Sequence, residues 1–119
     1  MFLLALAVLV IGISSACEEE DDRDYALDVF VTVRDTVLTQ NALVHIYAPV
    51  DESTVDYYLY TDEDGKVSIQ LKNKAVVEIV ASRSPYKACT FAELNRGVTR
   101  VDLDMKLFSA VDNGCRENQ

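Results

Sequence analysis

The stretch that decides the fold is Lys66-Val67-Ser68-Ile69-Gln70-Leu71-Lys72. Polar and apolar side chains alternate along it without a break, and this period of two is typical of a β-strand with one buried face. A turn signal comes just before it, because Asp64-Gly65 supplies residues that tolerate the positive φ angles of tight hairpins. The pattern predicts a strand that is entered through a hairpin turn at residues 62–65.

The same alternation recurs on both sides of this strand. Further strands are predicted over residues 25–34, 42–48, 55–61, 75–81, 86–91 and 98–108. About seven short strands with closely spaced turn signals predict an all-β fold, an antiparallel β-sandwich over residues 25–108. Its core is expected to contain Val29, Val31, Val44, Ile46, Ile69, Leu71, Leu103 and Met105. In the last strand, Val101 and Leu107 are also expected to face inward.

The N-terminus has a different character. Residues 1–16 carry no charged side chain, and the apolar run from Phe2 to Ile13 is too short for a bilayer-spanning helix of roughly 20 residues. Its length fits the hydrophobic region of an export signal, and Ser14-Ser15-Ala16 fits a small-residue cleavage site. We therefore expect residues 1–16 to be a signal peptide.

The four residues Ser14-Ser15-Ala16-Cys17 resemble the lipobox of bacterial lipoproteins, although a Leu is commoner where Ser14 stands. The resemblance implies that Cys17 is acylated and anchors the protein in a membrane. Residues 18–22 are all acidic and are similar to tethers that direct some lipoproteins to the outer face of the outer membrane. Such a run also fits a solvated spacer, because like charges repel one another. Residues 17–24 are therefore expected to be a flexible tether.

A second resemblance covers about residues 27–108. The segments Asn41-Ala42-Leu43-Val44-His45-Ile46-Tyr47 and Thr61-Asp62-Glu63-Asp64-Gly65-Lys66-Val67 are similar to motifs of transthyretin-like, or carboxypeptidase-regulatory-like, β-sandwich domains. The chain lacks a Gly in the link of residues 34–40 and beside Tyr86, where many members have one. The resemblance implies a transthyretin-like or Ig-like sandwich. It also implies an accessory module without a catalytic centre, used for adhesion or docking.

Cysteine usage agrees with an exported protein. With Cys17 occupied by lipid, Cys89 and Cys115 remain as an even number in a compartment that permits disulfides. A bridge between them would fasten the C-terminal tail, residues 109–119, to the domain. Two separate thiols are the alternative, because the sequence does not fix the geometry that a bridge requires.

Charge and motifs exclude several classes of function. The six acidic residues and one basic residue between Glu18 and Asp24 contribute −5 of the net charge of −9. This acidic balance without a basic cluster argues against nucleic-acid binding. The chain has one histidine, no tryptophan and no hydrolase or phosphate-loop motif. We expect no catalytic residues and no cofactor.

Three weaker candidates remain to be weighed. Residues 62–64 offer carboxylates to Ca²⁺, but the motif is incomplete and a plain turn explains it, so no metal site is expected. Asp102 and Asp104 alternate on the outward face of the last strand, where solvation accounts for them. A nucleophile pair of His45 and Cys89 is disfavoured, because a lone histidine on an alternating strand is usually a half-exposed sheet residue.

Tyrosines provide the only feature that suggests binding. Tyr58 and Tyr60 share one face of their strand. In the preceding strand, Tyr47 is on the face opposite to Val44 and Ile46. If the two strands are neighbours, the three rings form a surface stripe suited to protein or sugar contacts. Alternatively, the rings cover the second face of the sandwich or pack under the loop of residues 49–54.

These observations favour a non-enzymatic envelope lipoprotein. The expected protein is a small β-sandwich binding or accessory module, held at the outer membrane by lipid on Cys17, at the cell surface or on the periplasmic face. Its partner would be an envelope protein or a glycan. The alternative is a small ligand-carrying or enzyme-like transthyretin-fold domain.

Overall fold

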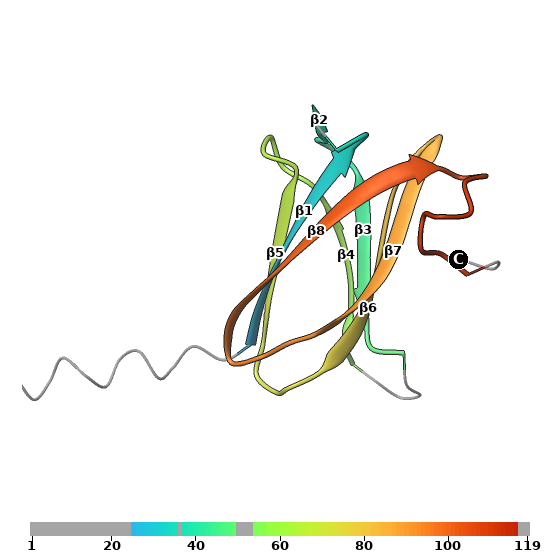
Figure 1. Ribbon diagram of the computed structural model, residues 1–119. Helices are drawn as coiled ribbons and strands as arrows, with labels where there is room; N and C mark the ends of the chain where they lie inside the picture. The colour runs from blue at the N-terminus through green and yellow to red at the C-terminus, as the bar shows by residue number, and fades with distance from the viewer. Residues whose placement is uncertain (1–24, 36, 50–53, 117–119) are drawn as a thin grey trace, which may run out of the picture.

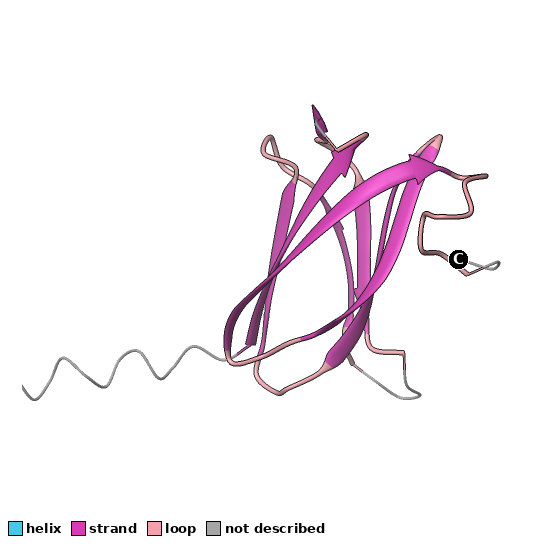
Figure 2. Cartoon of the chain, viewed as in Figure 1, coloured by secondary structure: helices cyan, strands magenta, loops and turns pink. Residues whose placement is uncertain are grey.

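A computed structural model describes residues 25–35, 37–49 and 54–116. Within these ranges the chain forms eight strands joined by short loops and no helix (Figure 2), hence no helix that is long and apolar enough to cross a membrane. The strands are β1 Tyr25–Val33, β2 Val37–Leu38, β3 Leu43–Tyr47, β4 Asp56–Tyr60, β5 Lys66–Leu71, β6 Val76–Arg83, β7 Tyr86–Glu93 and β8 Gly97–Leu107. The predicted signal peptide and tether lie outside the described residues.

The strands form one curled sheet that folds back into two packed layers. Its hydrogen-bonded order is β2-β1-β8-β7-β6-β3-β4, and β5 pairs with β1. One layer therefore contains β5, β1 and β8, and the other contains β7, β6, β3 and β4. Strand β8 passes from the first layer to the second (Figure 1), pairing with β1 over most of its length and with β7 at Lys106 and Leu107. The prediction of an all-β sandwich is confirmed.

The alternating pattern fills the space between the layers. All eight residues expected in the core are buried, and Leu27, Ala42, Val77, Ile79 and Leu94 are fully buried beside them. The cross-strand pair of Leu27 and Ile69 connects β1 to β5 within this core. Burying apolar side chains at about 25 cal/mol per Å² is the main stabilising term for such a fold. Val101, also expected inward, is half-buried and packs against the core.

One pairing is not antiparallel. Strands β1 and β8 run parallel, with Tyr25 opposite Gly97 and Val33 opposite Met105. The expectation of a purely antiparallel sandwich is therefore wrong at this pair. Side chains alternate between the two faces of a strand in both kinds of ladder, so the sequence pattern does not distinguish them.

The turn at residues 62–65 also has a different role from the one expected. Gly65 has φ of 71°, as the Asp-Gly pair predicted, but β4 and β5 do not pair and the turn crosses between the layers. The Gly65 carbonyl accepts a hydrogen bond from the Val31 amide at 2.8 Å. A Cβ on Gly65 would lie 2.8 Å from the Val31 carbonyl oxygen, so only glycine fits this approach.

Strand β2 and Leu107, both at one end of the sandwich, also differ from the expectation. The link expected between the first two long strands contains β2, a two-residue strand paired with Thr32 and Val33. Leu107, expected to face inward, is half exposed. It lies at the last position of β8, paired with Tyr86 at the start of β7. At this position β8 extends beyond the end of the core, so an apolar residue in the alternating pattern is left partly exposed.

Candidate binding surface

The outer face of β3 and β4 carries a stack of aromatic rings. The His45 imidazole lies 4.1 Å from the Tyr58 ring, with 7° between their planes, and 4.4 Å from the Tyr47 ring. His45 and Tyr58 are directly opposite each other in the antiparallel pair, and Tyr47 is two residues along β3 on the same face. The two strands are neighbours, as the expected stripe of Tyr47, Tyr58 and Tyr60 required. The rings that stack are Tyr47, His45 and Tyr58, with the unexpected His45 between the two tyrosines.

The middle ring of the stack is held by a carboxylate, and the tyrosines of β4 are exposed to solvent. The His45 Nε2 atom lies 2.7 Å from a carboxylate oxygen of Asp56, which orients the imidazole between the tyrosines. Tyr58 is 62% exposed and Tyr60, the next outward residue of β4, is 68% exposed. We call the outer surface formed by His45, Tyr47, Tyr58 and Tyr60 the aromatic face. Such rings offer a large contact area with a polar tip at low entropic cost.

A buried carboxylate supports the inner edge of this face. Glu78 of β6 is directly opposite Tyr47 in the sheet and is only 1% exposed. Its carboxylate accepts a hydrogen bond from the Tyr47 hydroxyl at 2.6 Å and two from the Arg116 guanidinium, at 2.8 and 3.1 Å. These hydrogen bonds raise the pKa of Arg116, and the pair keeps a charged Glu78 compatible with burial.

The C-terminal tail holds Arg116 in place. Cys89 of β7 and Cys115 are joined by a disulfide, with their Cα atoms 4.8 Å apart. The Cys89 amide also donates to the Asn113 carbonyl at 2.9 Å, and Gly114 packs so closely on β7 that an added Cβ would overlap the Cys89 carbonyl. The sequence alone points to both cysteines but not to Glu78 or Arg116. Since Cys89 is in a disulfide, it forms no nucleophile pair with His45.

The remaining sequence candidates have structural roles or lie outside the described residues. Cys17, the expected lipid site, belongs to the second group. An Asp62 carboxylate oxygen accepts hydrogen bonds from the Asp64 and Lys66 amides, which explains the acidic turn as a turn. In the part of the chain that the structure describes, no group of His, Cys, Asp or Glu side chains is arranged to hold a metal ion.

Asp104 is more than a solvated carboxylate. It accepts hydrogen bonds from the Asp35 amide at 2.6 Å and from the Thr32 hydroxyl at 3.0 Å. Burial alone would raise its pKa, but these hydrogen bonds and the nearby Lys106 charge outweigh burial and lower the pKa below its ordinary value. The ionised Asp104 therefore fastens the turn after β1 to β8.

This lowered pKa predicts an acid-dependent loss of stability. A carboxylate with a depressed folded-state pKa stabilises the fold above its unfolded pKa, and the contribution disappears as the pH falls through the folded value. At neutral pH, Asp104→Asn should lower the free energy of unfolding by roughly 1 kcal/mol, which is the contribution that the parent protein itself loses in acid. Urea unfolding of both proteins, measured from neutral pH down to about pH 2.5, should give free energies that converge in acid. A constant difference across this range would contradict the assignment.

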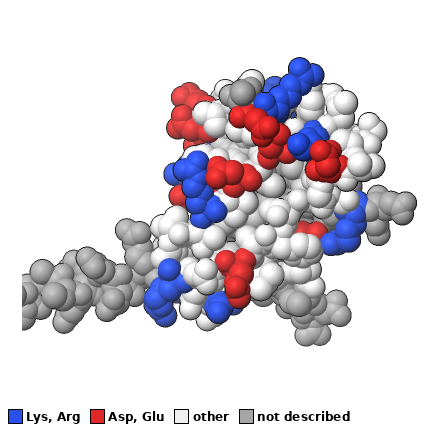
Figure 3. Space-filling view, in the orientation of Figure 1, with Lys and Arg blue, Asp and Glu red and all other residues white. Residues whose placement is uncertain are grey.

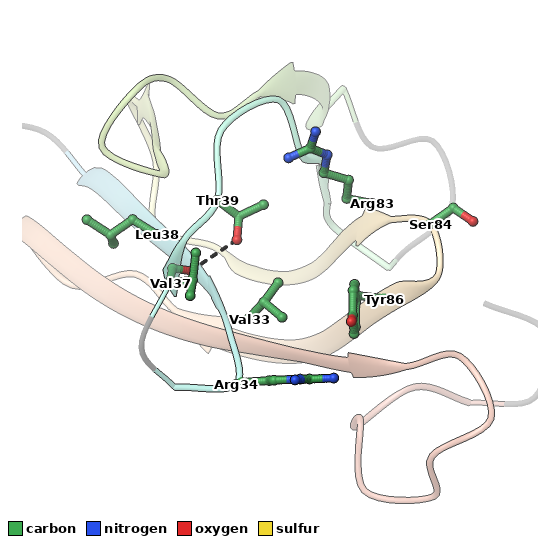
Figure 4. A pocket seen from close by; sticks show the side chains of 8 residues that line it. All are labelled: Val33, Arg34, Val37, Leu38, Thr39, Arg83, Ser84 and Tyr86. Atoms are coloured by element: carbon green, nitrogen blue, oxygen red, sulfur yellow. Dashed lines mark hydrogen bonds between the residues drawn. The ribbon is translucent and has the colours of Figure 1, made fainter.

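A pocket of about 500 Å³ lies at the end of the sandwich where β1 ends (Figure 4). Val33, Val37 and Leu38 form an apolar side, and Tyr86 stands on another. Arg34 and Arg83 lie on opposite sides of the space, and Arg83 also donates to the Gln40 carbonyl at 2.9 Å. Its size suits a small molecule with an apolar part.

On the side of the protein seen in Figure 3, acidic and basic side chains are interspersed.

Comparisons with known proteins place the fold and nothing more. No protein-family model and no curated protein sequence matches the chain. Among solved structures, the Bacillus anthracis TIE protein aligns with 70% of this chain at a TM-score of 0.56 and 10% identity. BcpA, the major pilin subunit of Bacillus cereus, aligns with 68% at 0.53 and 15%. The chain spans only 16% and 28% of these two proteins.

Proposed function

We propose that this protein is a non-enzymatic binding module, anchored in the bacterial envelope by lipid on Cys17 and displayed at the outer membrane. The observation that carries the binding part is the aromatic face. Four side chains on adjacent strands share this face and form a platform, three of them stacked, and Tyr58 and Tyr60 are more than 60% exposed. Large exposed rings on a rigid sheet are characteristic of recognition surfaces, where aromatic side chains supply much of the affinity.

The hydrogen bonds that hold the rings from the side favour a preformed surface. His45 is held by Asp56, and Tyr47 is held by the buried Glu78, so two of the four rings are fixed before any partner arrives. Preorganisation of this kind reduces the entropy lost on binding. An envelope protein or a glycan fits the platform, since both present apolar faces together with hydrogen-bonding groups. The accessory roles of transthyretin-like sandwiches, which the sequence resembles, agree with this proposal.

The test of binding uses substitutions on the platform and a control away from it. Tyr58→Ala combined with Tyr60→Ala should weaken retention of the full-length protein by solubilised envelope proteins or an immobilised glycan panel at least tenfold, which corresponds to about 1.4 kcal/mol. Val98→Ala is the matched control, because Val98 is an exposed apolar residue on β8. Equal retention of the double variant and the parent would contradict the proposal.

The anchor has its own test. Intact-mass analysis of the membrane fraction from the native host should show loss of residues 1–16 and an added mass of lipid on Cys17. Burial of acyl chains contributes about 0.8 kcal/mol per methylene, so Cys17→Ser should release the protein from that fraction. A mature chain that begins at an unmodified Cys17 and is recovered in the soluble fraction would refute the lipoprotein assignment.

A second candidate is a ligand-carrying domain, and the pocket between Arg34 and Arg83 favours it. Here the bound molecule would be small, with an apolar part against Val37 and Leu38. Saturable binding of a small molecule that is lost in Leu38→Asp, or turnover of a chromogenic substrate panel by the purified protein, would favour this candidate over the first.

A further inference from the structure

Strand β4 is an edge strand with little protection against pairing in the residues that the structure describes. Among the described strands it is hydrogen-bonded to β3 alone. Natural proteins usually protect such edges with charged side chains, above all lysine, or with proline, a bulge or a covering segment. The five residues of β4, Asp-Tyr-Tyr-Leu-Tyr, contain neither lysine nor proline, their one charged residue is Asp56 at the first position, and three of the five are aromatic. Of the other edge strands, β2 has only two residues, and β5 begins with Lys66 and is followed by Lys72.

The hydrogen-bond phase shows which backbone groups this edge presents. The Thr61 amide donates to the Ala42 carbonyl, and the Val55 carbonyl accepts from the Ala48 amide, so both flanking residues bond towards β3. Bonding alternates along an antiparallel strand. The N–H and C=O groups of Asp56, Tyr58 and Tyr60 therefore point away from β3. These are also the residues whose side chains lie on the exposed side.

A cavity lies on the inner side of the same edge. It has a volume of about 440 Å³, and its lining includes Tyr57 of β4 and Leu71 of β5. Val55, just before β4, and Ala75, just before β6, add apolar surface. A strand laid beside β4 would place every second side chain on this inner face. Lys72 and Lys74 also line the cavity, so beside Tyr57 it offers an inward side chain of the added strand a site that is apolar in part.

The charges around the edge indicate what the outer side chains of such a strand should be. Asp56 is 59% exposed at one end of β4, and the exposed turn of residues 62–64 supplies three more carboxylates at the other end. Tyr58 and Tyr60 between them offer ring faces that attract cations. Lysine or arginine on the outward positions of an added strand would meet both kinds of group.

We propose that β4 binds an extended peptide segment of a protein partner by strand addition, with basic side chains outward and apolar side chains inward. This inference rests on the proposed function, because it names the partner class of the aromatic face. Main-chain hydrogen bonds to Asp56, Tyr58 and Tyr60 provide the affinity. The inner cavity and the outer carboxylates select the alternating pattern.

Hydrogen exchange provides the first test, on the full-length chain in detergent micelles. The amides of Tyr58 and Tyr60 should exchange rapidly in the protein alone, while those of Tyr57, Leu59 and Thr61 are protected. Adding an eight-residue peptide of alternating valine and lysine should slow exchange at Tyr58 and Tyr60 at least tenfold. Exchange at these two amides that does not change at millimolar peptide would overturn strand addition.

Proline scanning provides the second test. Tyr58→Pro removes an amide that points away from β3, so it should leave the fold intact, as proline is tolerated on edge strands. Relative to Tyr58→Ala, which removes the same ring but keeps the amide, it should weaken binding of the valine–lysine peptide about tenfold, the effect of roughly one hydrogen bond. Equal affinities of the two variants would overturn the proposal.

Control peptides separate this inference from the proposed function. Replacing lysine with glutamate in the peptide should abolish binding if the carboxylates select the partner, and unchanged binding would refute the charge assignment. If the platform retains a glycan and ignores both peptides, strand addition is wrong while the binding function stands. If neither glycan, envelope protein nor peptide is retained, both proposals fail.

Discussion

Ile69→Asp should leave the protein unfolded at room temperature. Ile69 is 8% exposed on β5 and packs opposite Leu27, which is fully buried on β1. An unpaired carboxylate at this position would cost several kcal/mol, a large share of a total stability of about 5–15 kcal/mol. Circular dichroism in the β-sheet region should show loss of the folded signal, and urea titration should show no cooperative transition.

The neighbouring residue on the same strand supplies the control. Gln70 is exposed, so Gln70→Asp adds the same charge to the same strand on its solvated face. Its urea midpoint should stay close to that of the parent protein, within the roughly 0.5 kcal/mol typical of surface substitutions. Parent-like unfolding of Ile69→Asp itself would show that the inner face of β5 does not form the core.

Loss of the disulfide should have the next largest effect. The bridge between Cys89 and Cys115 closes a loop of 26 residues, and in the chain-entropy description its removal costs about 3 kcal/mol. Cys115→Ser is the better variant, because Cys89 is buried and its replacement would also disturb β7. The measured loss of stability should exceed this loop-closure contribution, because Arg116 is then no longer held beside Glu78.

Non-reducing thermal unfolding measures this effect. Ser109→Ala changes an exposed residue of the same tail and should unfold with the parent protein, while Cys115→Ser unfolds at a lower temperature. Peptide mapping of the oxidised parent should recover Cys89 and Cys115 in one linked pair. Two free thiols in the exported protein, or a Cys115→Ser variant as stable as its parent, would count against a stabilising bridge.

Much of the fold could be predicted because it depends on side-chain alternation. The period of two in residues 25–34 and 66–72 identified strands and their buried faces, and all eight named core residues are buried. Pairing partners could not be predicted in the same way. Val31 shows why, since it contacts Gly65 through backbone groups and lies opposite Leu103 in a parallel ladder. The spacing of apolar residues along the sequence predicts neither contact.

The candidate site was predictable to a smaller extent. The outward positions of Tyr47 and Tyr58 follow from alternation, and their placement on one face of neighbouring strands follows once β3 and β4 pair. His45 is 25% exposed, as expected for a half-exposed sheet residue, but its role between the rings depends on cross-strand register. Glu78 could have been noticed as an acid within Val-Val-Glu-Ile-Val. Its partner Arg116 lies 38 residues away in the tail, where no local signal marks it.

The parallel pairing of β1 with β8 also bears on how the chain reaches its fold. The first and last strands of the domain lie side by side, with Tyr25 opposite Gly97 (Figure 1). The closing contacts are therefore among the most distant in sequence, so the relative contact order is high and a large loop must close before they form. Domains of this kind fold on the order of milliseconds to seconds. In a chain that emerges from its N-terminus, β1 first gains only the two-residue pairing with β2. Its long pairings form after β5 and β8 have followed, so the sheet stays incomplete until nearly the whole domain is present.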